Sequence, residues 1–342
     1  MTPTFPLILT VRRDAMRLAE PFRISGYLFE AMPATVVTLS DGESSGRGEA
    51  AGVYYLGDDP AHMESAIEGV RAAIEAGVDR EALRALLPAG GARNAIDCAL
   101  WELESLRAER PIWKLAGAPE PRPIVTTFTI PADGPVQVAR KLAPLGAARA
   151  IKIKLTGDLD ADADRIRTIR KLRPDVWLGV DANQGYDVDT IDPLLAVLVS
   201  ERVSLLEQPI RRGTEAQLAG WTSPIPVAAD ESILDLAELR ERHAHFDVIN
   251  IKLDKCGGLT EALAMAHEAR RLGKQVMVGN MAGSALAMAP GFVLAQFCDV
   301  VDLDGPYFLA EDPWATTIYE DGRIMIPTSF WGAADVHAPA TA

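Results

Sequence analysis

Residues 150–155 read AIKIKL, a short segment in which apolar and charged side chains alternate. Successive side chains of a strand point to opposite faces. Ile151, Ile153 and Leu155 would therefore pack against surrounding helices, while Lys152 and Lys154 point into the interior of a closed sheet. The alternative is a strand at the edge of a sheet with both lysines in solvent, because alternating strands are common.

Similar apolar segments recur through the rest of the chain and favour the closed sheet. Eight of them alternate with amphipathic helical stretches at spacings of roughly 20–30 residues. They cover residues 124–130, 150–155, 177–181, 204–207, 227–230, 248–252, 275–278 and 300–302. This rhythm predicts a (β/α)7β TIM-like barrel, an α/β fold. An open doubly wound sheet would need a glycine-rich phosphate loop after its first strand, and none is seen.

The N-terminal part has a different pattern. Alternating segments at 7–18 and 35–39 read as antiparallel strands, and helical stretches follow between residues 60 and 107. We therefore expect an α+β capping domain over residues 1–120 and a catalytic barrel over residues 121–304. Residues 305–342 are too short to fold alone and are expected to complete the capping domain.

Composition narrows the class of protein. The chain has 342 residues, 48% of them hydrophobic, and a net charge of −14, which argues against nucleic acid or an anionic membrane as partner. Cys98, Cys256 and Cys298 are too few and too scattered for a disulfide framework. With no signal peptide and no membrane-spanning run, we expect a cytoplasmic enzyme that acts on a small molecule. The sequence leaves the oligomeric state open, and a homo-oligomer is compatible with it.

Three acidic residues end consecutive predicted barrel strands: Asp181 in GVDANQ, Glu207 in LLEQP and Asp230 in AADES. They are about one β/α unit apart, so they would meet at the face where β/α barrels build active sites. Three close carboxylates need a cation between them, and an all-oxygen ligand set suits Mg²⁺. The alternative, that each acid caps a following helix, is plausible for one acid but poor for all three.

Lysines end two other strands of the predicted barrel. Lys152 and Lys154 would lie side by side, so desolvation and like-charge repulsion would lower the pKa of one of them and let it accept a proton. Lys252, in VINIKLDKCGG, lies across the barrel from Lys154. Two opposed lysines around a metal-bound carboxylate predict proton transfer at the adjacent carbon. The alternative for Lys252 alone is an ion pair, which we also expect for Lys255.

Taken together, the K-x-K, D-A-N, E-Q-P, D-E-S and N-I-K-L-x-K-x-G-G motifs resemble the enolase superfamily, in its muconate-lactonising subgroup. The resemblance extends over the whole chain and implies a role for each residue of the site. The opposed acid/bases would be Lys154 and Lys252, with Lys152 supporting Lys154. The Mg²⁺ ligands would be Asp181, Glu207 and Asp230, flanked by Asn183 and Glu231.

Within this subgroup the segments LPAGGARNAIDCALWEL (87–103) and NIKLDKCGGLTEALA (250–264) are similar to L-Ala-D/L-Glu epimerases. Asp302 and Asp304, in VVDLDGP, would bind the ammonium group of a dipeptide, unless they form only a solvated strand end. The resemblance implies a dipeptide epimerase that inverts the second residue's α-carbon by 1,1-proton transfer through an enediolate. It also implies a role in recycling cell-wall peptides.

Other functions remain open on the same scaffold. N-succinylamino acid racemase, o-succinylbenzoate synthase or a cycloisomerase would not need a free ammonium group, so Asp302 would matter little. A non-catalytic binding barrel is the third alternative, but such a protein would be expected to lose at least one lysine or metal ligand.

Two motifs depart from the resemblance. Gly283, in GNMAGSA, stands where many relatives have glutamate, which would reshape the pocket near the metal. Glutamate-selective relatives have an arginine in the loop that here reads PFRISGYLFEA. Arg23 lies nearby and could bind a side-chain carboxylate, whereas Tyr27, Leu28 and Phe29 could form an apolar pocket. The alternative is that Tyr27–Phe29 only pack the capping domain against the barrel.

Overall fold

A barrel of eight parallel strands forms the larger part of the computed structural model, which describes residues 6–24 and 27–334. Each strand pairs with the next one along the chain. The strands are β5 (Thr127–Ile130), β6 (Ala150–Lys154), β7 (Trp177–Asp181), β8 (Leu205–Glu207), β9 (Val227–Ala229), β10 (Val248–Lys252), β11 (Gln275–Gly279) and β12 (Val300–Val301). The predicted TIM-like architecture is confirmed.

Side chains join the first strand of this sheet to the last. Thr126 Oγ1 accepts a hydrogen bond from the backbone N–H of Leu303 at 3.0 Å. Next to it, the Thr127 hydroxyl donates to the carboxylate of Asp302. These bonds link the two ends of the nearly closed sheet, and Asp302 lines the cavity of the barrel.

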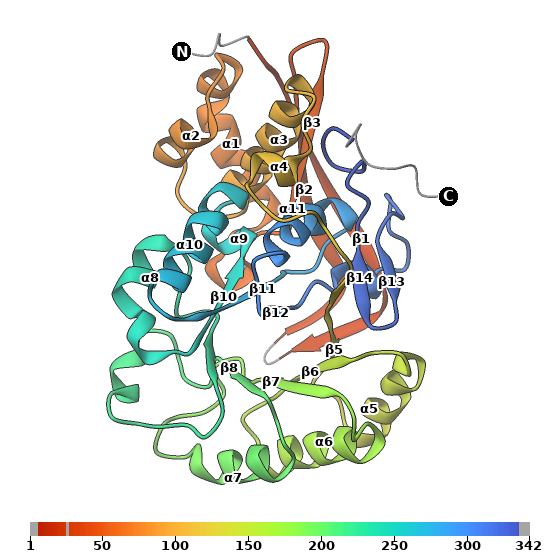
Figure 1. Ribbon diagram of the computed structural model, residues 1–342, viewed down its shortest axis with the longest axis vertical. Coiled ribbons are helices and arrows are strands. Elements are labelled where there is room, and N and C mark those ends of the chain that lie inside the picture. Colours follow the sequence, from red (N-terminus) through yellow and green to blue (C-terminus); the bar gives the residue numbers. More distant parts are fainter. Residues whose placement is uncertain (1–5, 25–26, 335–342) are drawn as a thin grey trace.

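Helices lie around the barrel strands (Figure 1). They are α5 (Pro135–Leu142), α6 (Leu159–Leu172), α7 (Asp192–Ser200), α8 (Leu236–Arg242), α9 (Leu253–Cys256), α10 (Leu259–Arg271) and α11 (Ala285–Ala295). Between β8 and β9 only a short 3-10 helix, Glu215–Leu218, takes the place of an α-helix. Ile151, Ile153 and Leu155 are buried in the apolar layer beneath the helices. Because β6 lies between β5 and β7, the alternative of an edge strand is excluded.

An antiparallel sheet with helices on one side makes up the N-terminal part. Its elements are β1 (Ile8–Ile24), β2 (Tyr27–Ser40), β3 (Ser45–Ala50), α1 (Pro60–Glu75), α2 (Arg80–Leu86), α3 (Gly91–Arg107) and α4 (Ile112–Leu115). Gly46 and Gly48 let α3 approach β3 closely, since a Cβ at either would lie 2.0 Å from a carbonyl oxygen of that helix. In Figure 1 the β1–β2 hairpin extends from this part toward β5 and β6 of the barrel.

The C-terminal segment returns to the N-terminal sheet. Arg47 donates to the carbonyl of Phe330 at 2.7 Å, and the Trp331 indole donates back to the carbonyl of Arg47 at 3.1 Å. A small sheet joins β4 (Ile124–Val125), β13 (Ile318–Glu320) and β14 (Arg323–Met325). The domain boundaries at residues 120 and 305 stay a prediction. Over residues 6–24 and 27–334, no helix is both long and apolar enough to cross a bilayer.

Candidate active site

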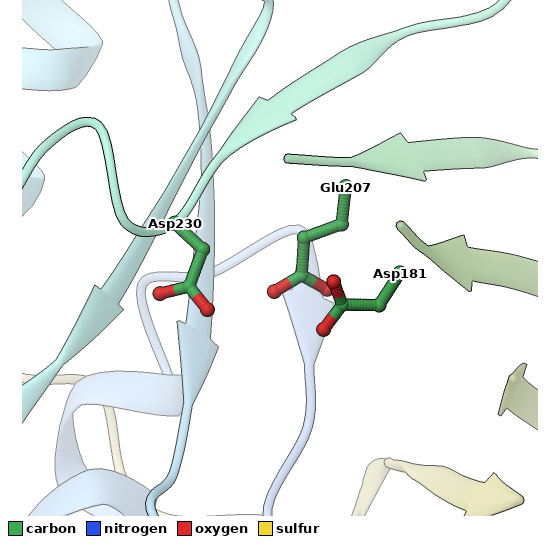
Figure 2. Close-up of side chains that lie close together, drawn as sticks. All are labelled: Asp181, Glu207 and Asp230. Carbon is green, nitrogen blue, oxygen red and sulfur yellow. The ribbon is translucent and has the colours of Figure 1, made fainter. Parts of the chain in front are cut away.

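Three buried carboxylates converge at the ends of neighbouring barrel strands. Asp181 and Glu207 end β7 and β8 and stand opposite each other in the strand register, while Asp230 follows β9 directly. One oxygen from each lies within 4.8 Å of those from the other two. Figure 2 shows the three side chains turned toward a common point. The convergence expected from their spacing is therefore present.

The chemistry of this cluster fits a divalent cation. Glu207 Oε2 is buried and accepts no hydrogen bond, although Lys152 Nζ lies 3.3 Å away. Burial, and then the neighbouring charge of Asp181, raise the pKa of Glu207 to about 7. A cation that binds oxygen ligands would neutralise the three close carboxylates and give Glu207 Oε2 a partner. Mg²⁺ is such a cation.

Two lysines flank the carboxylates from different strands. Lys154 Nζ, at the end of β6, is 2.5 Å from Asp181 Oδ2. Lys252 Nζ, at the end of β10, is 2.6 Å from Asp230 Oδ2. Burial opposes the charge of Lys252, but Asp230 and Glu207 outweigh it and hold its pKa well above the ordinary value. Both side chains line one cavity, so a ligand between them would meet a lysine on either side.

The third lysine has a different environment. Lys152 is 3% exposed and forms an ion pair with Asp302. Burial opposes its charge, yet Asp302 and Glu207 raise its pKa above the ordinary value. The repulsion that we predicted between Lys152 and Lys154 is thus largely neutralised, because Asp302 balances one of the two charges.

Asp302 and Asp304 lie together on the wall of the same cavity. Asp304 accepts a hydrogen bond from the backbone N–H of Thr129 at 2.7 Å and one from Asn280 Nδ2 at 3.2 Å. Burial and the charge of Asp302 raise the pKa of Asp304 to about 6. Asp302 is already paired with Lys152, so Asp304 is the better placed of the two to bind an added cation.

Four further residues flank the three carboxylates: Asn183, Glu231, Lys255 and Asn250. The backbone N–H of Asn183 donates to Asp181 Oδ1 at 2.9 Å, and side-chain oxygens of Asn183 and Glu231 are buried without a partner. Lys255 forms the expected ion pair, at 2.7 Å from Asp230 Oδ1. Asn250, which we did not predict, donates to Glu207 Oε1 at 2.7 Å. Its position two residues before Lys252 on the same strand could have revealed it, since both side chains share a face.

The N-terminal part supplies most of the outer wall of the cavity, with Leu18, Phe22, Phe29, Met32, Tyr54 and Tyr55. Sequence patterns did not identify the two tyrosines, which lie on a loop fixed by the hydrogen bond from Gly52 N to Asp254 Oδ1 at 2.9 Å. Tyr27 packs against Tyr54 with ring centroids 4.7 Å apart, but it does not line the cavity. The side chain of Arg23 is exposed and does not line it either, so its predicted contact with substrate stays a prediction.

The loop after β11 completes the wall with Asn280, Met281 and Ala282. Glu49 of β3 holds this loop, because it accepts a hydrogen bond from Ser284 N at 2.9 Å and another from the Ser284 hydroxyl. Gly283 has a φ of +147°, and a Cβ there would lie 2.8 Å from the Cβ of Ala287 and 3.1 Å from Glu49 Oε1. A larger residue at position 283 would therefore collide with Ala287 and crowd the carboxylate of Glu49.

Comparison with known proteins finds matches over most of the chain. Residues 8–117 match the mandelate racemase/muconate lactonizing enzyme N-terminal domain, and residues 136–329 match the enolase C-terminal domain-like family. The L-Ala-D/L-Glu epimerase of Escherichia coli is 35% identical over 316 residues, which are 92% of this chain and 98% of that protein.

Two solved structures extend the comparison. An enolase family member of Agrobacterium tumefaciens with homology to dipeptide epimerases was solved with bound sodium and L-Ala-L-Glu. It has a TM-score of 0.91 and 35% identity, over 96% of this chain and 100% of that one. A dipeptide epimerase of Enterococcus faecalis, complexed with Mg and L-Leu-L-Tyr, has a TM-score of 0.84 and 26% identity, over 91% and 92%.

Proposed function

Because the chain belongs to the mandelate racemase/muconate lactonizing enzyme family of the enolase superfamily, we propose that it is a magnesium-dependent dipeptide epimerase. It would invert the α-carbon of the second residue. The observation that carries this proposal is the pair Lys154 and Lys252, which reach one cavity from different strands on either side of a carboxylate cluster. This arrangement suits removal of a proton from one face of a carbon and its return to the other.

Each group of the site has a proposed task. Asp181, Glu207 and Asp230 would hold the metal. When bound, Mg²⁺ would supply positive charge that stabilises the negative charge developing on the substrate carboxylate. Lys154 and Lys252 would alternate as proton acceptor and proton donor, according to which epimer is bound.

The supporting residues fix these groups in place. Lys152 balances Asp302 and Glu207 within the buried wall. Asn183 and Glu231 flank the ligands, each with a buried side-chain oxygen that has no partner in the described chain. Such oxygens could accept hydrogen bonds from metal-bound water.

Asp304, with Asp302 beside it, supports a substrate that has a free ammonium group. The two side chains place negative charge on the cavity wall near Thr129 and Asn280. An ammonium group has three donors and would stabilise the charged form of Asp304. An N-succinylamino acid offers no such group, so the acidic wall favours dipeptides over N-succinylamino acids.

The compartment and pathway also belong to the proposal. The three cysteines are free thiols, as expected in a reducing cytoplasm. A role in the recycling of cell-wall peptides remains what the family resemblance suggests. The relatives bind second residues as different as glutamate and tyrosine, so they leave that side chain open.

Proton NMR in D₂O tests the function directly. The purified protein with Mg²⁺ is incubated with a panel of L-Ala-L-Xaa dipeptides. We expect the α-proton signal of the second residue to disappear while the other diastereomer appears. Excess EDTA should stop both changes, and added Mg²⁺ should restore them. Exchange with N-succinylamino acids but with no dipeptide would contradict the proposal.

A further inference from the structure

We propose that the residue inverted by this enzyme has an apolar or aromatic side chain, so that its substrates are hydrophobic dipeptides rather than dipeptides ending in glutamate. This inference rests on the proposed epimerase function and specifies the substrate class of the same site. It follows from the apolar side chains that line the cavity and from the ion pairs that its lysines already form.

The outer wall of the cavity is apolar. Seven uncharged side chains line it. Some come from the N-terminal sheet and its adjoining loop, and the others from the loops after β11 and β12. They are Leu18, Phe22, Phe29, Met32, Tyr54, Met281 and Phe308. Contact with such a wall stabilises an apolar side chain in proportion to the area that leaves water. A carboxylate would instead lose its hydration without gaining a partner there.

The cations of the cavity are already paired with acids. In the described part of the chain the lining cations are Lys152, Lys154 and Lys252, and no arginine lines the cavity. Each of the three is within 2.6 Å of a carboxylate oxygen. A second carboxylate on the substrate would find no free cation of the kind that a bidentate arginine provides.

The lining acids add a second reason. Asp230 and Asp302 are the acids that pair with Lys252 and Lys152, and two further acids, Glu231 and Asp304, also face this cavity. An anionic side chain bound among them would be repelled at short range in a poorly hydrated space. An uncharged side chain avoids this cost. The acidic groups and the apolar wall therefore both favour an apolar second side chain over an anionic one.

Aromatic rings identify where the second side chain would lie. Tyr54 packs edge-on against Phe29 with ring centroids 5.3 Å apart, and Tyr54 lines the same cavity as Lys252. This aromatic wall therefore stands near the reacting carbon. Phe22 and Phe308 form a separate edge-on pair, 4.8 Å apart. Because Phe308 follows Asp304 closely in the chain, that pair would cover the first residue.

The test compares substrates on the unmodified enzyme. Initial epimerisation rates with L-Ala-L-Phe, L-Ala-L-Leu and L-Ala-L-Glu give the ratio of kcat/KM. Burial of one large apolar side chain corresponds to about 10- to 100-fold in this ratio, and we expect at least that preference for L-Ala-L-Phe. Equal rates, or a preference for L-Ala-L-Glu, would overturn the inference while leaving the epimerase function intact. No reaction with any dipeptide would overturn both.

A charge-placing variant tests the wall itself. Phe29→Arg would put a guanidinium group in the cavity, and it should lower kcat/KM for L-Ala-L-Phe about 10-fold or more while raising it for L-Ala-L-Glu. Val136→Arg is the matched control, because Val136 is an exposed apolar residue of α5 outside the cavity. The control should keep the specificity of the unmodified enzyme. If Phe29→Arg folds, as shown by an unchanged thermal transition, and its specificity is also unchanged, Phe29 does not face the second side chain.

Discussion

Replacement of Lys255 by methionine should destabilise the protein and weaken metal binding together. Lys255 Nζ is buried within hydrogen-bond distance of the Asp230 carboxylate, at 2.7 Å, and of the carbonyls of Asp230, Ile233 and Asn250, at 2.5, 3.1 and 3.0 Å. Methionine fills a similar volume but donates nothing. Removing one partner of a buried ion pair costs about 3–5 kcal/mol. Part of this is offset, because Lys252 remains 2.6 Å from the Asp230 carboxylate and Ile233 N also donates to the Asp230 carbonyl, so we expect about 3 kcal/mol.

Urea denaturation in excess EDTA measures this loss without a contribution from the metal. Lys171→Met, the same change at an exposed position of α6, is the control and should alter the free energy of unfolding by less than about 0.5 kcal/mol. Titration with Mg²⁺ should show about 10- to 100-fold weaker binding by Lys255→Met, since Asp230 loses a group that orients it. A stability loss below about 1 kcal/mol, or unchanged Mg²⁺ affinity, would refute the reasoning.

Two further predictions concern the contact between α3 and the barrel. Arg93→Met should lower the free energy of unfolding by about 3 kcal/mol in urea denaturation, because buried Glu261 loses its 2.7 Å partner and keeps only Arg84, at 3.3 Å; a loss under about 1 kcal/mol would contradict this. Burial raises the pKa of Asp97 to about 6 from 3.8, although Thr260 donates two hydrogen bonds to it. The folded state thus binds this proton more tightly, so up to about 3 kcal/mol of stability is lost as the pH rises from about 4 to 6. Asp97→Asn should lack that part of the pH dependence. If the free energy of unfolding falls with pH equally steeply in both proteins, the prediction is wrong.

The barrel could be predicted because its local signals and its tertiary structure agree. Each strand carries apolar residues that pack under helices, so the eight segments stand out in the sequence. The N-terminal hairpin is longer than its pattern indicated, since β1 extends to Ile24 and β2 begins at Tyr27. The alternation is interrupted there by a register shift between Arg17 and Phe22. Pairing with the partner strand, not local sequence, fixes this region.

Only part of the candidate site could be predicted from the sequence. Residues at strand ends, such as Asp181 and Lys252, could be placed because the fold brings all strand ends to one face. Contacts between segments that lie far apart in the sequence could not be predicted. The ion pair of Lys152 with Asp302 joins the second barrel strand to the loop after the last, and Tyr54 reaches the cavity from the N-terminal part. No local pattern encodes these distances.

The most direct test of the two-lysine account is the stereochemistry of α-proton exchange in single variants. Lys252→Ala and Lys154→Ala are each incubated in D₂O with Mg²⁺ and with each diastereomer of a dipeptide that the enzyme accepts. Epimerisation should fall by at least about 100-fold in both. Each variant should still exchange the α-proton of one diastereomer, and the two variants should exchange opposite ones. Exchange of the same diastereomer by both variants, or epimerisation retained by either, would contradict the account.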